Sequence, residues 1–357
     1  RVVYVEDSDD YTSCYDPRTG SMTEDPTYGL SFARRELARL GFEAGWSYYD
    51  AHRDRWHGPL ASKRESVFDG ADVLLNLAAV NPVRDWAVGV PVRVFVDQDP
   101  VFTQIANMTK PGRKPLLDRH NAFATFAESF GSERCTVPDD GIAWRTTRQP
   151  VMAERWTATP PPTDGCFTSV LQWDSYPPQR FGDRVFGMKS MSFDDYLDLP
   201  SRTEAIFELA VGAPRDVRRG LHEKGWRTRD SQEVTRDVAS YESYIRASKA
   251  ELGIAKHGYV ASRSGWFSER SVAYMVNGRP VVLQDTGFSE HLPVGEGVLA
   301  FTSLEEAEDA VRTASAAPSR HGRAAREIAR QHFDGRRIVA SLLEGAFEDA
   351  GAAAARG

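Results

Sequence analysis

Cysteine is scarce in this chain, whose 357 residues include only Cys14, Cys135 and Cys166. Their odd number and irregular spacing exclude a disulfide framework and a zinc motif, so reduced thiols in the cytoplasm are the simplest account. No apolar run approaches the roughly 20 residues of a membrane-spanning helix, which excludes membrane insertion. The opening Val2–Val5 resembles a strand and not a signal peptide, and without an initiator Met we expect a few residues to precede Arg1.

Positive charge is also in short supply, with 44 Lys and Arg against 51 Asp and Glu, a net charge of −7. This balance argues against a general nucleic-acid binder, which needs clustered cations for the phosphate backbone. An acidic protein can still bind a nucleotide through a helix N-terminus and a few arginines. With 41% hydrophobic residues the chain forms real cores, and its length predicts two domains.

The stretch from His257 to Leu292 carries the strongest local signals. It predicts a strand over 258–261, a loop over 262–267 and a helix from the N-cap Ser268 to about Val276. Asn277-Gly278 ends that helix, and a buried strand over 280–283 runs into the turn at 285–287.

Two parts of this stretch suit a phosphate group. The loop before Ser268 offers unpaired backbone N–H groups and a positive helix end, with Arg263 and Arg270 beside it. The turn at Thr286-Gly287 follows a strand, where open α/β sheets place their ligands. The ordinary alternative is a βαβ unit whose polar loops contact only water.

The N-terminal half alternates strand and helix patterns, which predicts a parallel, doubly wound sheet. We expect strands at 2–5, 43–49, 73–77 and 93–96, helices at 28–40 and 119–130, and irregular chain at 53–64. On the 119–130 helix, Phe123, Phe126 and Phe130 would share one face and belong to the core.

Pro160-Pro161-Pro162 is the best linker candidate, because a proline run is stiff and extended. Beyond it we expect strands at 168–171 and 205–211, and helices at 217–224, 241–251, 304–314, 320–331 and 338–349, with a frayed tail over 351–357. Gly212 ends the second of these strands, so it and the following Arg215 form another phosphate-friendly position. A solvated helix face is an equally good account of Arg215 and its neighbours Arg218 and Arg219.

Three short motifs resemble the donor half of GT-B glycosyltransferases: Ser264–Ser271, Gly278–Val282 and Gln284–Phe288. The chain is most similar to the bacterial branch with spore-coat-type (CgeB-like) C-terminal domains, over roughly Gly225–Phe333. Thr286 to Glu290 corresponds to the Gly-Gly-x-x-Glu of that group. Retaining enzymes of the group carry a Glu where this chain has Ala273, and Glu269 lies one turn earlier as a possible substitute.

This resemblance implies two Rossmann-like domains that face each other across a cleft. Residues 1–160 would bind the acceptor and 165–335 the nucleotide sugar, with the helix at 338–349 packing back on the first domain. The residues expected to bind the donor are Gly212, Arg215, Lys256, Arg263, Ser264, Gly265, Ser268, Glu269, Arg270, Thr286, Gly287 and Glu290. For Lys256 the ordinary alternative is a surface lysine.

Glycosyl transfer also needs a group that accepts the acceptor's proton. Asp97 and Asp99 are the better candidates, since both follow a strand terminus. For Asp99, which precedes a proline, the alternative is a turn-forming residue. His120 is a third candidate, with helix capping as its alternative, and Asp7, Asp9 and Asp10 compete for the same role. Asp97-Gln98-Asp99 resembles the metal-binding motif of GT-A enzymes only superficially, so we expect no metal and no cofactor besides the nucleotide sugar.

The function expected from the sequence is transfer of a hexosyl or deoxyhexosyl group to a small-molecule natural product or a glycan. The Ala, Arg and Asp usage is typical of an actinobacterial source, where such products are common. Two rivals stay open: a non-hydrolysing sugar-nucleotide epimerase, and a non-catalytic helper protein with the same fold, which Ala273 makes a serious alternative. The sequence leaves the oligomeric state open.

Overall fold

A computed structural model of the chain describes residues 1–355, which group into two compact units. Unit 1 contains residues 1–97, 111–124 and the chain from 344 onward, and unit 2 contains residues 98–110 and 125–343. The division therefore differs from the expected one at residue 160, because residues 125–160 group with the C-terminal half. The helix predicted at 338–349 belongs to both units, since its residues from Glu344 onward group with unit 1.

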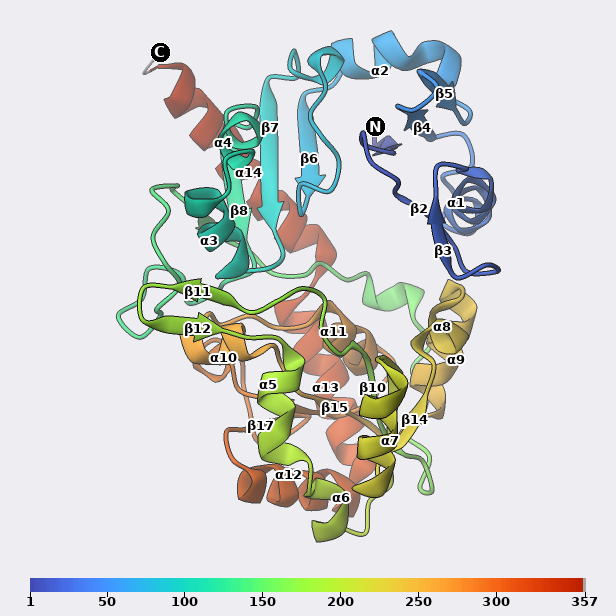
Figure 1. Cartoon of the computed structure of the whole chain (residues 1–357), viewed down its shortest axis with the longest axis vertical. Helices are drawn as coiled ribbons and strands as arrows, with labels where there is room; N and C mark the ends of the chain where they lie inside the picture. The colour runs from blue at the N-terminus through green and yellow to red at the C-terminus, as the bar shows by residue number, and fades with distance from the viewer. Residues whose placement is uncertain (356–357) are drawn as a thin grey trace. The chain divides into compact units, whose positions relative to one another are not determined.

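Unit 1 is an α/β unit whose strands form two separate larger sheets (Figure 1). In the first sheet, of order β1-β4-β5, β1 and β4 are parallel and β5 is antiparallel. The second contains β6, β7 and β8 in that order, with β6 and β7 parallel. The elements of unit 1 are β1 (Tyr4–Asp7), β2 (Cys14–Asp16), β3 (Ser21–Thr23), α1 (Thr27–Arg39), β4 (Trp46–Asp50), β5 (Arg55–His57), α2 (Arg64–Asp69), β6 (Val73–Leu77), β7 (Val92–Asp97), α4 (Arg113–Leu117) and β8 (Ala122–Thr125).

Unit 2 is built on a six-stranded sheet of order β14-β13-β10-β15-β16-β17, in which all neighbours are parallel. Its strands are β10 (Phe167–Gln172), β13 (Phe207–Gly212), β14 (Arg227–Arg229), β15 (Ala250–Gly253), β16 (Val281–Gln284) and β17 (Val298–Phe301), besides the short β9 (Arg145–Thr146), β11 (Gln179–Phe181) and β12 (Arg184–Phe186). Its helices are α3 (Phe102–Thr109), α5 (Lys189–Phe193), α6 (Leu199–Arg202), α7 (Arg215–Glu223), α8 (Ser231–Thr235), α9 (Val238–Ala247), α10 (His257–Ser262), α11 (Glu269–Val276), α12 (Leu304–Ala316) and α13 (Pro318–His332), and α14 (Gly335–Ala354) begins here.

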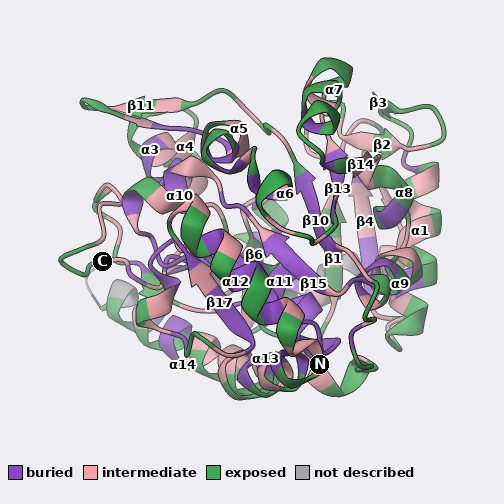
Figure 2. Cartoon of the chain, turned by 90° about the horizontal axis from the view of Figure 1, so that it is seen from below, coloured by how far each residue is buried: buried purple, intermediate pink, exposed green. Residues whose placement is uncertain are grey.

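Helices cover both faces of the unit 2 sheet because its strands are apolar on both. Along β16, Val282 packs into one core with residues of α5, α6, α7 and α12, whereas Val281 and Leu283 pack into another with residues of α9, α11 and α13. This alternation follows from the two-residue period of a strand. Figure 2 shows β10, β15 and β17 coloured as buried, with exposed residues on the outer sides of the helices. The predicted α/β fold is confirmed, and unit 2 has the expected doubly wound, parallel sheet. The single parallel sheet expected for the N-terminal half is instead divided into two sheets, the first of which contains the antiparallel strand β5.

The prediction of one long helix over 119–130 is wrong. This segment contains β8 instead, and the helices nearby are the shorter α3 and α4. The spacing of Phe123, Phe126 and Phe130 suggested a helical face, but Ala122, Ala124 and Thr125 are buried as well, as in a strand covered on both faces.

Four other local predictions need correction. Residues 258–261 lie in helix α10 and not in a strand, and the segment 53–64 contains strand β5. The helix expected to reach Glu251 ends at Ala247, and strand β15 follows it. The tail does not fray at residue 351, since α14 continues to Ala354; residues 356–357 of that predicted tail lie outside the described chain.

Between residues 1 and 355, no helix combines the length and the apolar character that crossing a membrane requires.

Candidate functional site

Unit 2 has a pocket at the carboxyl ends of the adjacent strands β10, β15 and β16. This is the edge at which open parallel sheets bind their ligands. The start of α11 and the chain leading into it form another wall. The pocket is lined by Ser169, Val170, Leu171, Lys189, Glu251, Leu252, Gly253, Ile254, Ala255, Trp266, Phe267, Ser268, Arg270, Ser271, Leu283, Gln284, Thr286 and Phe288.

The loop between α10 and α11 is held in one conformation by local bonds. Arg263 ends α10 in the left-handed region, with φ of 49°, and Gly265 follows with φ of 75°. The Gly265 N–H donates to the Thr286 carbonyl at 2.8 Å, and the Thr286 hydroxyl donates to the Trp266 carbonyl. A side chain at 265 would meet the backbone nitrogen of Ser129 at 2.7 Å, so only glycine allows this approach.

Ser268 caps helix α11 as predicted. Its backbone is extended, with φ of −88° and ψ of 136°, and its Oγ accepts the Arg270 N–H at 3.2 Å. Because the other N–H groups of the first turn have no partner within the helix, the positive end of α11 lies at the pocket wall.

Two ionisable side chains in this pocket are absent from the sequence prediction. Burial lowers the pKa of Lys189 to about 7, and its ammonium group donates to the Ile254 carbonyl at 2.8 Å. Burial raises the pKa of Glu251 to about 7. With Arg270 beside them, the pocket holds one full cation and, near neutral pH, an amine and a carboxyl group that are each only partly charged.

Among the described residues, the buried Trp266 Nε1 has no hydrogen-bond partner, whereas the Ser271 hydroxyl interacts with the Glu251 carboxyl and opposes the rise of its pKa. Leaving a buried polar group unpaired costs about 1–3 kcal/mol, so such groups are rare in the absence of a ligand or water. The pocket volume is about 30 Å³, which admits water-sized groups, such as the oxygens of a phosphate, and not a whole nucleotide.

Three predicted donor residues, Ser268, Arg270 and Thr286, line this pocket directly. Ser264 and Gly265 belong to the loop that supports it, and the Ser264 side chain is fully buried. Glu269 points outward, with 60% of its side chain exposed, and pairs with Arg270 at 3.1 Å.

Arg263, Gly287 and Glu290 form a separate polar group beside the loop. Glu290 pairs with Arg263 and, at 3.2 Å, with Arg134, and hydrogen bonds from these two guanidinium groups lower its pKa. Gly287 has φ of 100°, and its N–H donates to Asp285 Oδ1 at 2.9 Å. Arg263 is a weaker candidate for a ligand cation than Arg270, because its side chain is 40% exposed and does not line the pocket, whereas Arg270 lines the pocket and is 27% exposed.

Gly212 and Arg215 lie at the end of β13 and the start of α7, as predicted. A Cβ at position 212 would lie 2.1 Å from the Gln172 side-chain oxygen, so this glycine makes room for a neighbouring strand residue. Arg215 is exposed on the first turn of α7. Neither residue lines the pocket.

Lys256 and Asp99, predicted for different roles, are ion-paired in unit 2 at 2.8 Å. The Asp99 carboxylate also accepts hydrogen bonds from the hydroxyls of Tyr176 and Tyr259. The Lys256 ammonium lies over three aromatic rings, 4.8 Å from the Tyr176 centroid, 5.4 Å from Tyr259 and 5.1 Å from Phe102. Lys256 is therefore neither a free surface lysine nor a residue of the pocket.

The backbone next to Asp99 is strained. Val101 has φ of 69° and ψ of −47°, a region that β-branched residues rarely adopt, and its N–H donates to the Gln104 side chain at 2.7 Å. Such strain is concentrated at functional sites.

Asp97 and His120 lie in unit 1 and are both buried, Asp97 fully and His120 at 6% exposure. His120 Nδ1 lies 2.8 Å from the Leu116 carbonyl, and Nε2 lies 3.1 Å from the Asn76 side-chain nitrogen. Burial lowers the pKa of His120 to about 4. Since both ring nitrogens are occupied, His120 holds β6 and the end of α4 together instead of presenting a base.

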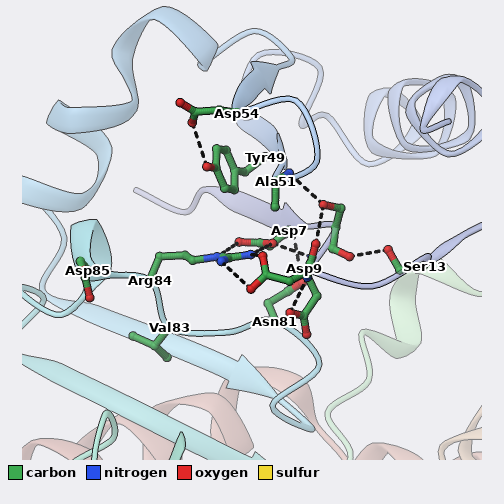
Figure 3. A network of polar contacts seen from close by, with 12 residues as sticks. Asp7, Asp9, Ser13, Tyr49, Ala51, Asp54, Asn81, Val83, Arg84 and Asp85 are labelled. Carbon is green, nitrogen blue, oxygen red and sulfur yellow. Dashed lines mark hydrogen bonds and ion pairs between the residues drawn. The ribbon is translucent and has the colours of Figure 1, made fainter. Parts of the chain in front are cut away.

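The competing candidates Asp7, Asp9 and Asp10 belong to a polar network in unit 1 (Figure 3). Arg84 makes two bonds to Asp7, at 2.9 and 3.0 Å, and an ion pair with Asp10 at 3.0 Å. The Asp9 N–H donates to Asp7 Oδ1 at 2.6 Å, and the Asp7 N–H donates to Asn81 at 3.1 Å. The network fixes the chain that follows β1 against the chain that follows β6.

No family model matches this chain, and no curated protein matches its sequence. Solved structures match it in fold. HepE of Anabaena, in complex with UDP-glucose, is 13% identical with a TM-score of 0.51, over 96% of this chain and 99% of that chain. An alpha-glucosyltransferase (AGT) in complex with UDP is 10% identical with a TM-score of 0.51, over 97% and 99%.

TarM is 11% identical with a TM-score of 0.46, and this chain spans 60% of its length. The fold predicted from the sequence, that of GT-B glycosyltransferases, is confirmed by the matches to HepE and AGT.

Proposed function

We propose that the protein transfers a glycosyl group from a nucleotide-diphosphate sugar to an acceptor, and that unit 2 binds the donor. The observation that carries this proposal is the unit 2 pocket, which is lined by Lys189, Arg270 and the N-terminus of α11 together with Trp266, whose buried indole N–H has no partner among the described residues. A doubly charged diphosphate is the ligand chemistry that suits two cations and a helix N-terminus. The fold shared with HepE, a protein solved with UDP-glucose, supports the same choice.

In the proposed reaction the bond between the anomeric carbon and the β-phosphate oxygen breaks, and the acceptor oxygen forms the new bond to that carbon. The nucleoside diphosphate leaves with the bonding electrons, and the acceptor proton is released to a base or to water. Arg270, Lys189 and the α11 N–H groups would stabilise the leaving negative charge, with Ser268 and Thr286 fixing its position. As expected from the sequence, we propose that the reaction uses no metal and no cofactor besides the nucleotide sugar.

For the base we retain Asp99 from the sequence prediction. Its side chain is 32% exposed, whereas Asp97 is fully buried and both nitrogens of His120 are occupied. The strained backbone at Val101 supports a functional role for this segment. Lys256 and the two tyrosines would hold the carboxylate in place.

We further propose the finer features expected from the sequence. The donor half would be of the CgeB-like type, and the transferred group would be a hexosyl or deoxyhexosyl group. The acceptor would be a natural product or a glycan and not a nucleic acid, and the protein would act in the cytoplasm of an actinobacterium. The remaining predicted donor residues, Gly212, Arg215, Arg263, Gly287 and Glu290, would surround the parts of the donor that extend beyond the pocket.

The test is to incubate the protein with a panel of UDP-, TDP-, GDP-, ADP- and CDP-sugars and to quantify the released nucleoside diphosphate and the fate of the sugar. Release with one nucleotide, or transfer to an added acceptor, supports the proposal. Inversion at the sugar C2 without release would identify the epimerase. Stabilisation against heat by a nucleotide without any turnover would identify the helper, because binding alone raises stability.

A further inference from the structure

Lys189 brings an amino group into the unit 2 pocket without an acidic partner. This group donates to the Ile254 carbonyl at 2.8 Å, and over the described residues 1–355 it forms no ion pair. A carbonyl oxygen accepts a hydrogen bond from a charged and from a neutral amine alike, so the contact does not require the charged form. Lys189 therefore differs from an ordinary lysine, whose ammonium group lies in water or faces a carboxylate.

The charged groups around this amine favour its neutral form. Burial has the largest effect, followed by repulsion from Arg270 and Lys256 and then by attraction to Glu251 and Glu269, so the pKa of Lys189 falls to about 7. At pH 7.5 the neutral amine is the main form, whereas a lysine with the usual pKa is neutral in roughly one molecule in a thousand. Only the neutral form has the lone pair with which an amine attacks carbon.

The space beside the amine is small, and it suits a negative charge. The pocket volume is about 30 Å³, which admits a group of a few atoms and excludes a sugar or a nucleotide. Arg270 and Ser268 line the same pocket, and the N-terminus of the eight-residue helix α11 lies at its wall. Carbon dioxide meets both conditions, because it is a neutral molecule of three atoms that leaves a carboxylate on an amine.

We infer that Lys189 reacts reversibly with carbon dioxide, which converts its amine into a carbamate within the unit 2 pocket. The nitrogen lone pair forms an N–C bond to the carbon of carbon dioxide while one C–O π pair moves onto oxygen, and the nitrogen then loses one proton to water. No electrons are gained or lost overall, so no oxidant or reductant takes part. The carbamate oxygens accept hydrogen bonds from the Arg270 guanidinium and from the first-turn N–H groups of α11.

The carbamate changes what the pocket can bind. Lys189 becomes an anion, which occupies the donors that a diphosphate would use and repels its negative charge. Carbon dioxide therefore inhibits donor binding, a regulation that rests on the proposed transferase function. Formation of the carbamate itself does not.

The test is to incubate the whole protein with 13C-labelled bicarbonate at pH 7.5 and to trap carbamates with triethyloxonium ion, which turns them into stable ethyl esters. Peptide mass spectrometry then locates the label. We expect at least about tenfold more label on Lys189 than on Lys114, an 82% exposed lysine that pairs with Asp118, because only Lys189 is buried beside other cations. In 13C NMR, one carbamate resonance should be absent from Lys189→Arg and present in the matched control Lys114→Arg.

Lys189 without label, or with no more label than Lys114, overturns the inference. Titration with UDP at equal ionic strength, with and without bicarbonate, separates it from the transferase proposal. If half of Lys189 carries the carbamate, bicarbonate should weaken UDP binding about twofold, and an unchanged affinity refutes the regulation. UDP binding to a protein whose Lys189 takes no label refutes only the carbamate, whereas labelled Lys189 in a protein that binds no UDP in bicarbonate-free buffer refutes only the donor site.

Discussion

The pocket of unit 2 is built around Lys189 and Arg270, whereas a second pocket, in unit 1, is lined by Glu6, Asp7 and Asp9. The unit 2 pocket lies where parallel strands end, the edge at which open sheets bind their ligands, whereas the unit 1 pocket is lined by β1, the first three residues of β4 and α1. The charge of each pocket is therefore determined by a few residues of the strands, helices and loops around it. In unit 2 the charge comes with a helix N-terminus, and in unit 1 with tyrosine and tryptophan side chains.

The largest effect is expected at the network that supports the acidic pocket. Asp7→Ala should lower the free energy of unfolding by about 3 kcal/mol, because it leaves the partly buried Arg84 without its main partner. Urea denaturation of the purified variant measures this loss. Asp10→Ala removes the other carboxylate of Arg84, which is 76% exposed, and should cost only a small fraction as much. Equal costs for the two variants would show that the network does not hold the loop after β1.

Arg270→Met should break the cationic pocket while keeping its packing. We expect the affinity for UDP to fall about 30-fold, equivalent to about 2 kcal/mol for a lost bond between charged groups. Calorimetric titration measures the change. Arg312→Met, an exposed arginine of α12 that pairs within its own helix, is the control and should bind UDP as the wild type does.

A pH series sharpens the contrast between the pockets. Lys189 has a pKa of about 7, so above pH 7 it must take up a proton to pair with a diphosphate. Glu251, whose pKa is also about 7, becomes negative over the same range and repels the anion. UDP affinity should therefore fall about tenfold between pH 7 and pH 8.5. In Lys189→Met the slope should be clearly shallower, and a wild-type affinity that is independent of pH would contradict this role.

The smallest effect is expected from Arg263→Ala, which the sequence alone ranks beside Arg270. Because Arg263 is 40% exposed and paired with Glu290, its removal should change UDP affinity by less than about threefold. The same titration decides the matter, and a loss as large as that of Arg270→Met would show that Arg263 leaves Glu290 for the ligand.

The sequence predicted those parts of the site that depend on local signals. The bounds of helix α11 were predicted correctly from the N-cap Ser268 and the Asn277-Gly278 stop. Most strands of both units were predicted from apolar runs. It failed at residues 119–130 and 258–261, where the phenylalanine spacing and a short β-type run favoured the wrong element and tertiary packing decides.

Lys189 and Glu251 could not be predicted in the same way. Lys189 stands in no motif, and Glu251 was assigned to a helix although it is a single acid in an otherwise apolar strand. If residues 250–253 had been assigned to a buried strand, the acid within it would have indicated a candidate site residue. The pairing of Asp99 with Lys256 joins residues 157 positions apart, and no spacing rule reports it.

The most direct test of the account is titration of UDP into the wild type, Arg270→Met and Arg312→Met. The account predicts that Arg270→Met loses about 30-fold in affinity, while Arg312→Met binds UDP as the wild type does. Equal UDP affinity in the three proteins would contradict donor binding in the unit 2 pocket.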